Sequence, residues 1–128
     1  MSTAVGHGIE VNVRVRFAPE HSDLRAGRFW FTYRITIVNK GERTVQLMRR
    51  HWTIIDTLAG PREVQGDGVV GEQPILAPGE KYTYSSFCDL RGGIGRMSGT
   101  YRMRDTDTEE PIEVAVPEFV MRCPYLAN

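Results

Sequence analysis

The sequence has no long apolar run, no excess of charge of either sign and very little cysteine. A membrane-spanning helix needs about 20 consecutive apolar residues, and no segment approaches that length. The sixteen lysines and arginines balance the sixteen aspartates and glutamates, so the formal net charge is zero. This balance argues against a polybasic nucleic-acid-binding surface, because phosphate neutralisation needs a clear cationic excess. The sequence therefore predicts neither a membrane span nor a nucleic-acid ligand.

The two cysteines, Cys88 and Cys123, do not form a C-x-x-C motif. Residues 1–15 lack the basic stretch and apolar block of a secretory signal peptide. Thiols in a chain without an export signal are expected to stay reduced. We therefore predict a cytoplasmic location and two free thiols.

Signatures of a metal site or a nucleophilic active site are also missing. The histidines, His7, His21 and His51, form no pair at chelate spacing, and no cysteine lies beside them. Ser85 and Ser86 lie within a predicted strand and outside any G-x-S-x-G elbow. We predict no metal site, no cofactor and no catalytic residue. A magnesium site would depend on the fold to group oxygen ligands from Asp56, Asp67, Glu72 and Asp89.

Alternation of apolar and polar residues, the pattern of a half-buried strand, dominates the chain, and no helical stripe is present. The alternating runs cover residues 9–17, 29–38, 45–49, 52–56, 62–65, 82–88, 97–103 and 112–123. Pro117 places the last run at a sheet edge or marks a bulge. About 7 to 8 short strands separated by turn signals predict a single antiparallel β-sandwich of fibronectin type III or immunoglobulin type. The predicted domain is residues 1–128, and Trp30 and Val38 would form an exposed apolar strip suited to a subunit interface.

Residues 66–71 form a G-x-G-x-x-G motif. In dinucleotide-binding folds this motif opens a helix whose N-terminus faces the pyrophosphate. Here Pro74 and Pro78 would each remove a backbone donor and clash with the preceding turn, so no helix can continue through them. We therefore exclude a Rossmann fold and predict that residues 66–80 form an irregular, helix-free segment.

Two interpretations of the glycine motif remain open. Its backbone N–H groups form a concave site for an anion, with Gly66, Gly68 and Gly71 as the binding residues. Alternatively, the glycines only permit positive φ in a tight loop that tucks Val69 and Val70 inward.

Several segments together resemble the bacterial ApaG family, namely residues 31–39, 45–52, 66–74, 78–80, 84–86 and 97–103. The resemblance covers nearly the whole chain and implies a fibronectin type III-like sandwich. It also implies an association with cobalt and magnesium efflux or tolerance. Similar domains in an F-box protein and a DNA-polymerase-interacting protein imply a partner-binding module. The family's glycine motif, a suggested diphosphate-binding element, falls on Gly66, Gly68 and Gly71.

These observations lead to three hypotheses. The first is a non-enzymatic binding or regulatory module, a homodimer that serves cobalt and magnesium homeostasis through a protein partner. It would make contact through a sheet edge or the Trp30 and Val38 strip. The second is a small diphosphate- or nucleotide-binding protein that uses the Gly66 to Gly71 loop and one basic residue, Arg49, Arg50 or Arg91. The third is a direct metal carrier.

Overall fold

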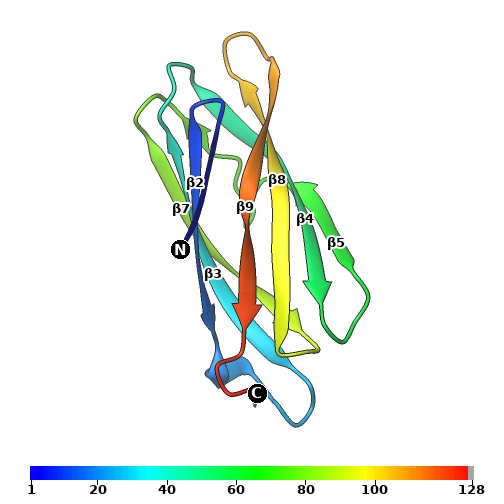
Figure 1. Ribbon diagram of the computed structural model, residues 1–128. Coiled ribbons are helices and arrows are strands. Elements are labelled where there is room, and N and C mark those ends of the chain that lie inside the picture. Colours follow the sequence, from blue (N-terminus) through cyan, green and yellow to red (C-terminus); the bar gives the residue numbers. More distant parts are fainter. Residues whose placement is uncertain (127–128) are drawn as a thin grey trace.

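The computed structural model describes residues 1–126, and strands make up most of this part of the chain (Figure 1). The only helical element among these residues is the 3-10 turn η1 at Pro19–His21, and no helix is long and apolar enough to cross a membrane. The strands are β1 (Ser2–Gly6), β2 (Ile9–Phe17), β3 (Phe29–Asn39), β4 (Val45–Asp56), β5 (Arg62–Asp67), β6 (Ile75–Leu76), β7 (Lys81–Leu90), β8 (Ile94–Asp105) and β9 (Pro111–Arg122).

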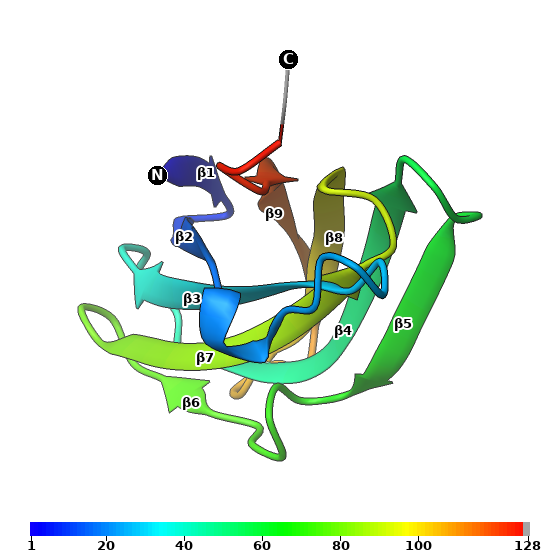
Figure 2. The same ribbon diagram turned by 90° about the horizontal axis from the view of Figure 1, so that it is seen from below.

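The strands form two antiparallel sheets that pack face to face. The first sheet has the order β1-β2-β3-β7, and the second has the order β5-β4-β8-β9, with β6 also paired to β4. The chain crosses between the sheets after β3, β6 and β7. On one side β9 lies against β1 and β2, whereas β5 and β7 are the sheet edges on the other side (Figure 2). The prediction of an all-β antiparallel sandwich is confirmed.

The core follows the predicted alternation. Ile35 and Ile37 of β3 are fully buried, and they face the buried side chains of the second sheet. Trp52 is central to this core, because its ring lies edge-on to Tyr33 at 5.9 Å and to Tyr101 at 6.1 Å between ring centroids. Such edge-to-face contacts add to the free energy gained by burying the rings.

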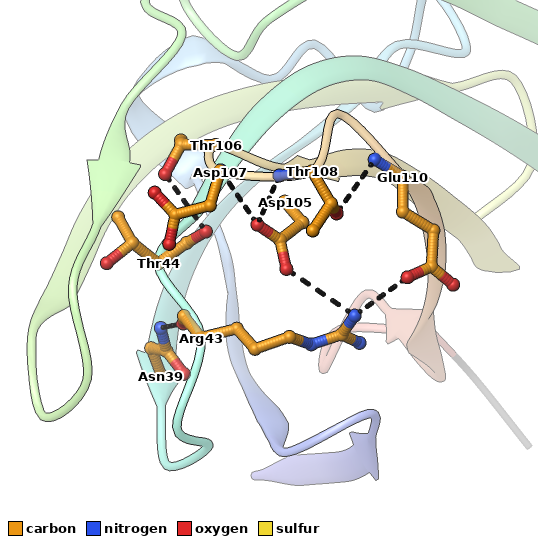
Figure 3. A network of polar contacts seen from close by, with 8 residues as sticks. All are labelled: Asn39, Arg43, Thr44, Asp105, Thr106, Asp107, Thr108 and Glu110. Carbon is orange, nitrogen blue, oxygen red and sulfur yellow. Dashed lines mark hydrogen bonds and ion pairs between the residues drawn. The ribbon is translucent and has the colours of Figure 1, made fainter.

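Three buried polar side chains, Asn39, Asp56 and Asp105, stand at the ends of β3, β4 and β8. Asp105 Oδ1 accepts hydrogen bonds from the backbone N–H groups of Asp107 (2.8 Å) and Thr108 (3.2 Å) (Figure 3). Arg43 Nη1 lies 3.5 Å from Asp105 Oδ2 and also contacts Glu110. These backbone bonds, with a smaller effect from Arg43, lower the pKa of Asp105. Asp105 therefore fixes the turn between β8 and β9.

The Asp56 carboxylate at the end of β4 likewise accepts hydrogen bonds from backbone N–H groups. Burial by itself would raise the pKa of Asp56, but hydrogen bonds from the N–H groups of Arg91, Leu58 and Gly92 outweigh burial and lower it. Its carboxylate thus connects the loop after β4 to the connection between β7 and β8.

We expect the fold to lose stability in acid because of these two carboxylates. A group whose pKa is lower in the folded state than in the unfolded state stabilises the fold above its unfolded value, about 3.9 for aspartate. That contribution is lost as the pH falls through the folded pKa. The urea midpoint should therefore decrease steadily below about pH 4, and Asp105→Asn should show a smaller decrease. Equal pH dependence in the two proteins would contradict this assignment.

The structure departs from the strand predictions at four places, one of which is the short strand β6, inside residues 66–80 that were predicted to be irregular. Residues 45–49 and 52–56 belong to one strand, β4, with a register shift between Leu47 and Arg49. Strand β1 has no counterpart among the predicted runs, and β5 continues through Asp67 into the glycine motif. The bulge expected at Pro117 is present, because the pairing of β8 with β9 shifts between Met97 and Gly99.

Candidate functional site

The glycine motif forms a tight turn beside the bulge of β4. Val69 and Glu72 exchange two backbone hydrogen bonds, of 2.8 and 2.9 Å, across a turn whose central residues, Val70 and Gly71, have φ values of 47° and 79°. Two successive positive φ angles are typical of a type I′ turn. The segment after Gly71 contains no helix, so the prediction of a helix-free segment over residues 66–80 is confirmed.

The three glycines of the motif differ in how far they tolerate a side chain. Gly66 lies in β5 opposite Arg50, and a Cβ atom there would lie 2.9 Å from Arg50 Nη1. Gly68 has φ +63°, and a Cβ atom there would lie 2.2 Å from the carbonyl oxygen of Glu72. Gly71 also has a positive φ but faces open space. Gly68 is therefore the position that least tolerates a side chain.

Polar contacts fix this turn to β4. Arg50 Nη1 donates to the carbonyl oxygens of Asp67 and Gly68, each at 3.0 Å. At the bulge, the carbonyl oxygen of Met48 accepts hydrogen bonds from Gly68 N at 2.8 Å and from Gln73 Nε2 at 3.1 Å. The loop thus presents carbonyl oxygens to a guanidinium group, and the amide of Gly68 is already engaged. Binding of an anion by Gly66, Gly68 and Gly71 stays a prediction.

The basic residues predicted to assist the loop lie in different places. Arg50 contacts the loop directly, and Arg49 Nη1 lies 3.4 Å from Asp67 Oδ1 on the outer face of the second sheet. Arg91 lies in the connection between β7 and β8, where its backbone N–H binds Asp56. Of the three, Arg49 and Arg50 are brought to the loop.

The turn also forms one wall of a cleft between the edge strands β5 and β7, with a volume of about 240 Å³. The residues that line it are Tyr33, Arg50, Trp52, Ile54, Val64, Val69, Val70, Tyr84, Ser86, Phe87 and Met97. We call this feature the edge cleft. Residues 66–71 contribute to it through Val69, which is buried as expected, and Val70, which is 60% exposed against expectation.

The rim of the edge cleft is apolar and exposed. Val64 is 40% and Phe87 is 56% exposed, values comparable with that of Val70. The Phe87 ring lies edge-on to Trp30 at 6.5 Å and to His21 at 5.9 Å between centroids. Large side chains left exposed around one hollow are typical of an interaction surface.

The apolar strip expected along β3 is not continuous. Trp30 is half-buried and its ring contacts Phe87 near one end of β3. Val38 lies near the other end of β3, between Glu10 and Lys81 on the neighbouring strands. The exposed Arg34 lies between them on the same strand face. The prediction of a continuous apolar strip from Trp30 to Val38 was therefore wrong. Only its Trp30 end is found, as part of an aromatic cluster with Phe87 and His21.

The inner wall of the edge cleft contains tyrosines that stay protonated. The hydroxyl groups of Tyr84 and Tyr101 lie 2.5 Å apart in a buried hydrogen bond. Burial raises the pKa of Tyr33, Tyr84 and Tyr101, in the last case reinforced by the neighbouring Tyr84. A neutral phenol does not act as a base at physiological pH, so Tyr33 and Tyr84 contribute shape and hydrogen bonds to the cleft, and Tyr101 binds Tyr84 from the core behind it.

Both cysteines are buried free thiols. Burial raises the pKa of Cys88 to about 11, and the thiolate is the reactive form. We expect Ellman's reagent to label neither cysteine appreciably in the native protein at pH 8 and both rapidly in denaturant. Stoichiometric labelling of the native protein within minutes would contradict this burial.

Within residues 1–126, no group of three or more histidine, cysteine, aspartate or glutamate side chains is arranged to hold a metal ion. Of the four carboxylates considered for magnesium, three are engaged separately, and Glu72 lies in the turn after the glycine motif, where its backbone pairs with Val69. Asp56 binds backbone N–H groups, Asp67 contacts Arg49, and Asp89 contacts Arg62 at 3.2 Å.

Comparison with known proteins gives a consistent result. The family described as the ApaG domain matches residues 19–105. The protein named ApaG from Anaeromyxobacter sp. (strain K) is 54% identical over the full length of both chains, and that from Bradyrhizobium sp. (strain BTAi1) is 44% identical over 97% of this chain and 94% of its own. A crystal structure of the ApaA protein of Bordetella pertussis superposes with a TM-score of 0.87 at 41% identity, covering 92% of this chain and 95% of its own. An Archaeoglobus fulgidus protein with 10% identity and a TM-score of 0.51 shares the fold alone, over 90% of this chain and 98% of its own.

Proposed function

The chain belongs to the ApaG family, and on this premise we propose that it is a non-enzymatic binding and regulatory module that contacts a protein partner at the edge cleft. One observation carries the proposal. Val64, Val70 and Phe87, from three separate segments, remain exposed around a single hollow that has a cation in its wall.

The edge cleft suits one apolar side chain of a partner. Burial of a phenylalanine or leucine side chain contributes about 1.5 to 3 kcal/mol, and anchors of this kind in well-packed pockets dominate protein interfaces. Arg50 binds the loop carbonyls through Nη1. Among the described residues, none accepts a hydrogen bond from its Nη2, which leaves donors for a backbone carbonyl or carboxylate of the partner.

The strands beside the cleft offer a second kind of contact. β5 and β7 are edge strands, and an edge strand has a row of backbone groups that can pair with an added strand. An extended partner segment that pairs with β7 would place alternate side chains over Phe87 and into the edge cleft. Apolar burial and backbone pairing would then act together.

The proposed role is in cobalt and magnesium homeostasis in the cytoplasm, which the resemblance to the ApaG family implies. The partner would provide the ion chemistry, and this chain would regulate it by binding. The homodimer expected from the sequence stays a prediction.

A complementation experiment tests the cleft and the ion link together. In a strain of the native host that lacks the gene and has altered cobalt tolerance, we expect the wild-type chain and Val120→Ser to restore tolerance, whereas Phe87→Ser and Val70→Asp should not. Val120 is the matched control because it is 57% exposed on β9 and does not line the edge cleft. All variants should melt within a few degrees of wild type, since exposed positions contribute little to stability. Full restoration by Phe87→Ser would contradict the proposal.

A diphosphate or nucleotide bound at the glycine loop is the second candidate. It is supported by the amides of Val70 and Gly71, which have no backbone acceptor among residues 1–126. Saturable amide shifts of these two residues on addition of pyrophosphate would support it. No shift at the loop would rule it out.

A further inference from the structure

The outer face of the first sheet places two arginines side by side. In the pairing of β2 with β3, Arg14 lies directly opposite Arg34, and both side chains are exposed. Directly opposed residues on antiparallel strands have Cβ atoms about 5 Å apart, and like charges at this spacing destabilise the sheet. This arrangement therefore costs stability unless an anion compensates the charges.

The surrounding charges leave this pair without compensation. The carboxylate that lines the same face, Glu10, is already bound by Lys40 and accepts a hydrogen bond from Asn12 at 2.8 Å. Lys81 adds a further cation, at the edge of a hollow that lies over this face of the sheet. Within the described residues, no carboxylate contacts Arg14, Arg34 or Lys81.

Hydroxyl groups complete the donor set. A hollow of about 460 Å³ lies over the face and is lined in part by Arg14, Arg34, Lys81, Thr36 and Thr83. The Thr36 and Thr83 hydroxyls lie 3.1 Å apart, and Ser85 is the register neighbour of Arg34 on β7. Arg14, Arg34 and Ser85 share one level of the sheet, the Thr36 and Thr83 pair lies two residues further along the strands, and Lys81 lies four residues along. Cationic and hydroxyl groups are the donors that an oxyanion requires.

The second sheet provides an internal comparison. Arg49 lies opposite Arg102 in the same way, but Asp67 contacts Arg49 at 3.4 Å, and Glu113 is the register neighbour of Arg102. Carboxylates of the chain therefore lie beside the pair of Arg49 and Arg102. The first sheet has an arginine pair of the same geometry whose counter-charge is not supplied by the described part of the chain.

We infer that the hollow over Arg14, Arg34 and Lys81 is a binding site for the phosphoryl group of a small phosphate- or diphosphate-bearing molecule. A phosphate dianion can accept hydrogen bonds from two adjacent guanidinium groups, whereas one guanidinium group is enough to bind both oxygens of a carboxylate. Three free cations on a chain of zero net charge suit a small ligand and fall short of a nucleic-acid surface. This site lies apart from the edge cleft and from the glycine loop, and it goes beyond the proposed partner contact.

The test is an amide chemical-shift titration of the whole chain with inorganic phosphate and with pyrophosphate. We expect saturable shifts in β2, β3 and β7 around Arg14, Arg34 and Ser85. Arg34→Gln should weaken binding by about tenfold or more, the loss expected for a charged hydrogen-bonding group. Arg102→Gln is the matched control, because it removes the same charge from the other sheet, and it should leave the affinity unchanged.

Each of three binding results would overturn the inference, as would the misplaced shifts named below: no saturable shift, an equal loss in both variants, or equally tight binding of an acidic peptide without phosphate. The last result would identify a carboxylate-rich protein ligand instead. Shifts confined to Val70 and Gly71 would also contradict it and would favour the glycine loop. Because Arg34 is outside the edge cleft, Arg34→Gln should still restore cobalt tolerance, which separates failure of this inference from failure of the partner contact.

Discussion

Gly68→Ala should destabilise the fold by about 3 kcal/mol. An alanine in the left-handed region costs about 1 to 2 kcal/mol, and its Cβ atom would lie 2.2 Å from the Glu72 carbonyl oxygen, so the turn would have to open. Opening the turn would also break the hydrogen bond from Gly68 N to Met48 O. Thermal unfolding should show a midpoint lowered by roughly 10 °C.

Gly71→Ala is the matched control for this prediction. Its φ of +79° is similar, but nothing lies within 4 Å of the added Cβ atom. The expected cost is therefore only the conformational one, about 1 kcal/mol. Equal losses in the two variants would show that the Glu72 contact does not restrict Gly68.

Asn39→Ala should be about as damaging, also near 3 kcal/mol. The buried Asn39 side chain donates to the carbonyl oxygens of Arg43 at 2.7 Å and Leu76 at 2.9 Å, and it accepts a hydrogen bond from Gly41 N at 3.0 Å. Alanine would leave the buried Leu76 carbonyl oxygen and two part-buried backbone groups without these partners, and an unsatisfied buried group costs about 1 to 3 kcal/mol. The contact to Leu76 also ties β6 to the end of β3.

Urea unfolding measures this loss, with Asn12→Ala as the control. Among residues 1–126, the Asn12 side chain binds only Thr3 and Glu10, on the outer face of the first sheet. Its removal should therefore change the free energy of unfolding by less than about 0.5 kcal/mol. A small effect of Asn39→Ala would mean that water replaces its bonds and that β6 is held mainly by its pairing with β4.

The β-sandwich could be predicted from the sequence because most strands have one buried face and one more exposed face. The buried residues Val11 and Val13 alternate strictly with polar neighbours, and this pattern is incompatible with a helix. β4 was divided in two because the bulge near Met48 shifts the alternation by one residue. β1 was missed because only a short stretch pairs with β2 and none of its side chains is fully buried.

The candidate site was only partly predictable. The two prolines after the glycine motif correctly excluded a helix, because their effect is local. The edge cleft depends on the chain topology, which brings Val64, Val70 and Phe87 together from separate segments. One local signal existed, since Phe87 is an aromatic residue at an outward position of a predicted strand. The pairing of Arg14 with Arg34 likewise requires the strand register, which alternation alone does not provide.

Site-specific photo-crosslinking in the native host tests the central claim most directly. A photoreactive phenylalanine analogue at position 87, on the rim of the edge cleft, should give one discrete adduct with another protein, and the same analogue at position 120 should give none. Adding Val70→Asp to the position 87 protein should abolish the adduct. Equal yields at the two positions, or an adduct that survives Val70→Asp, would show that the cleft is not where this protein meets its partner.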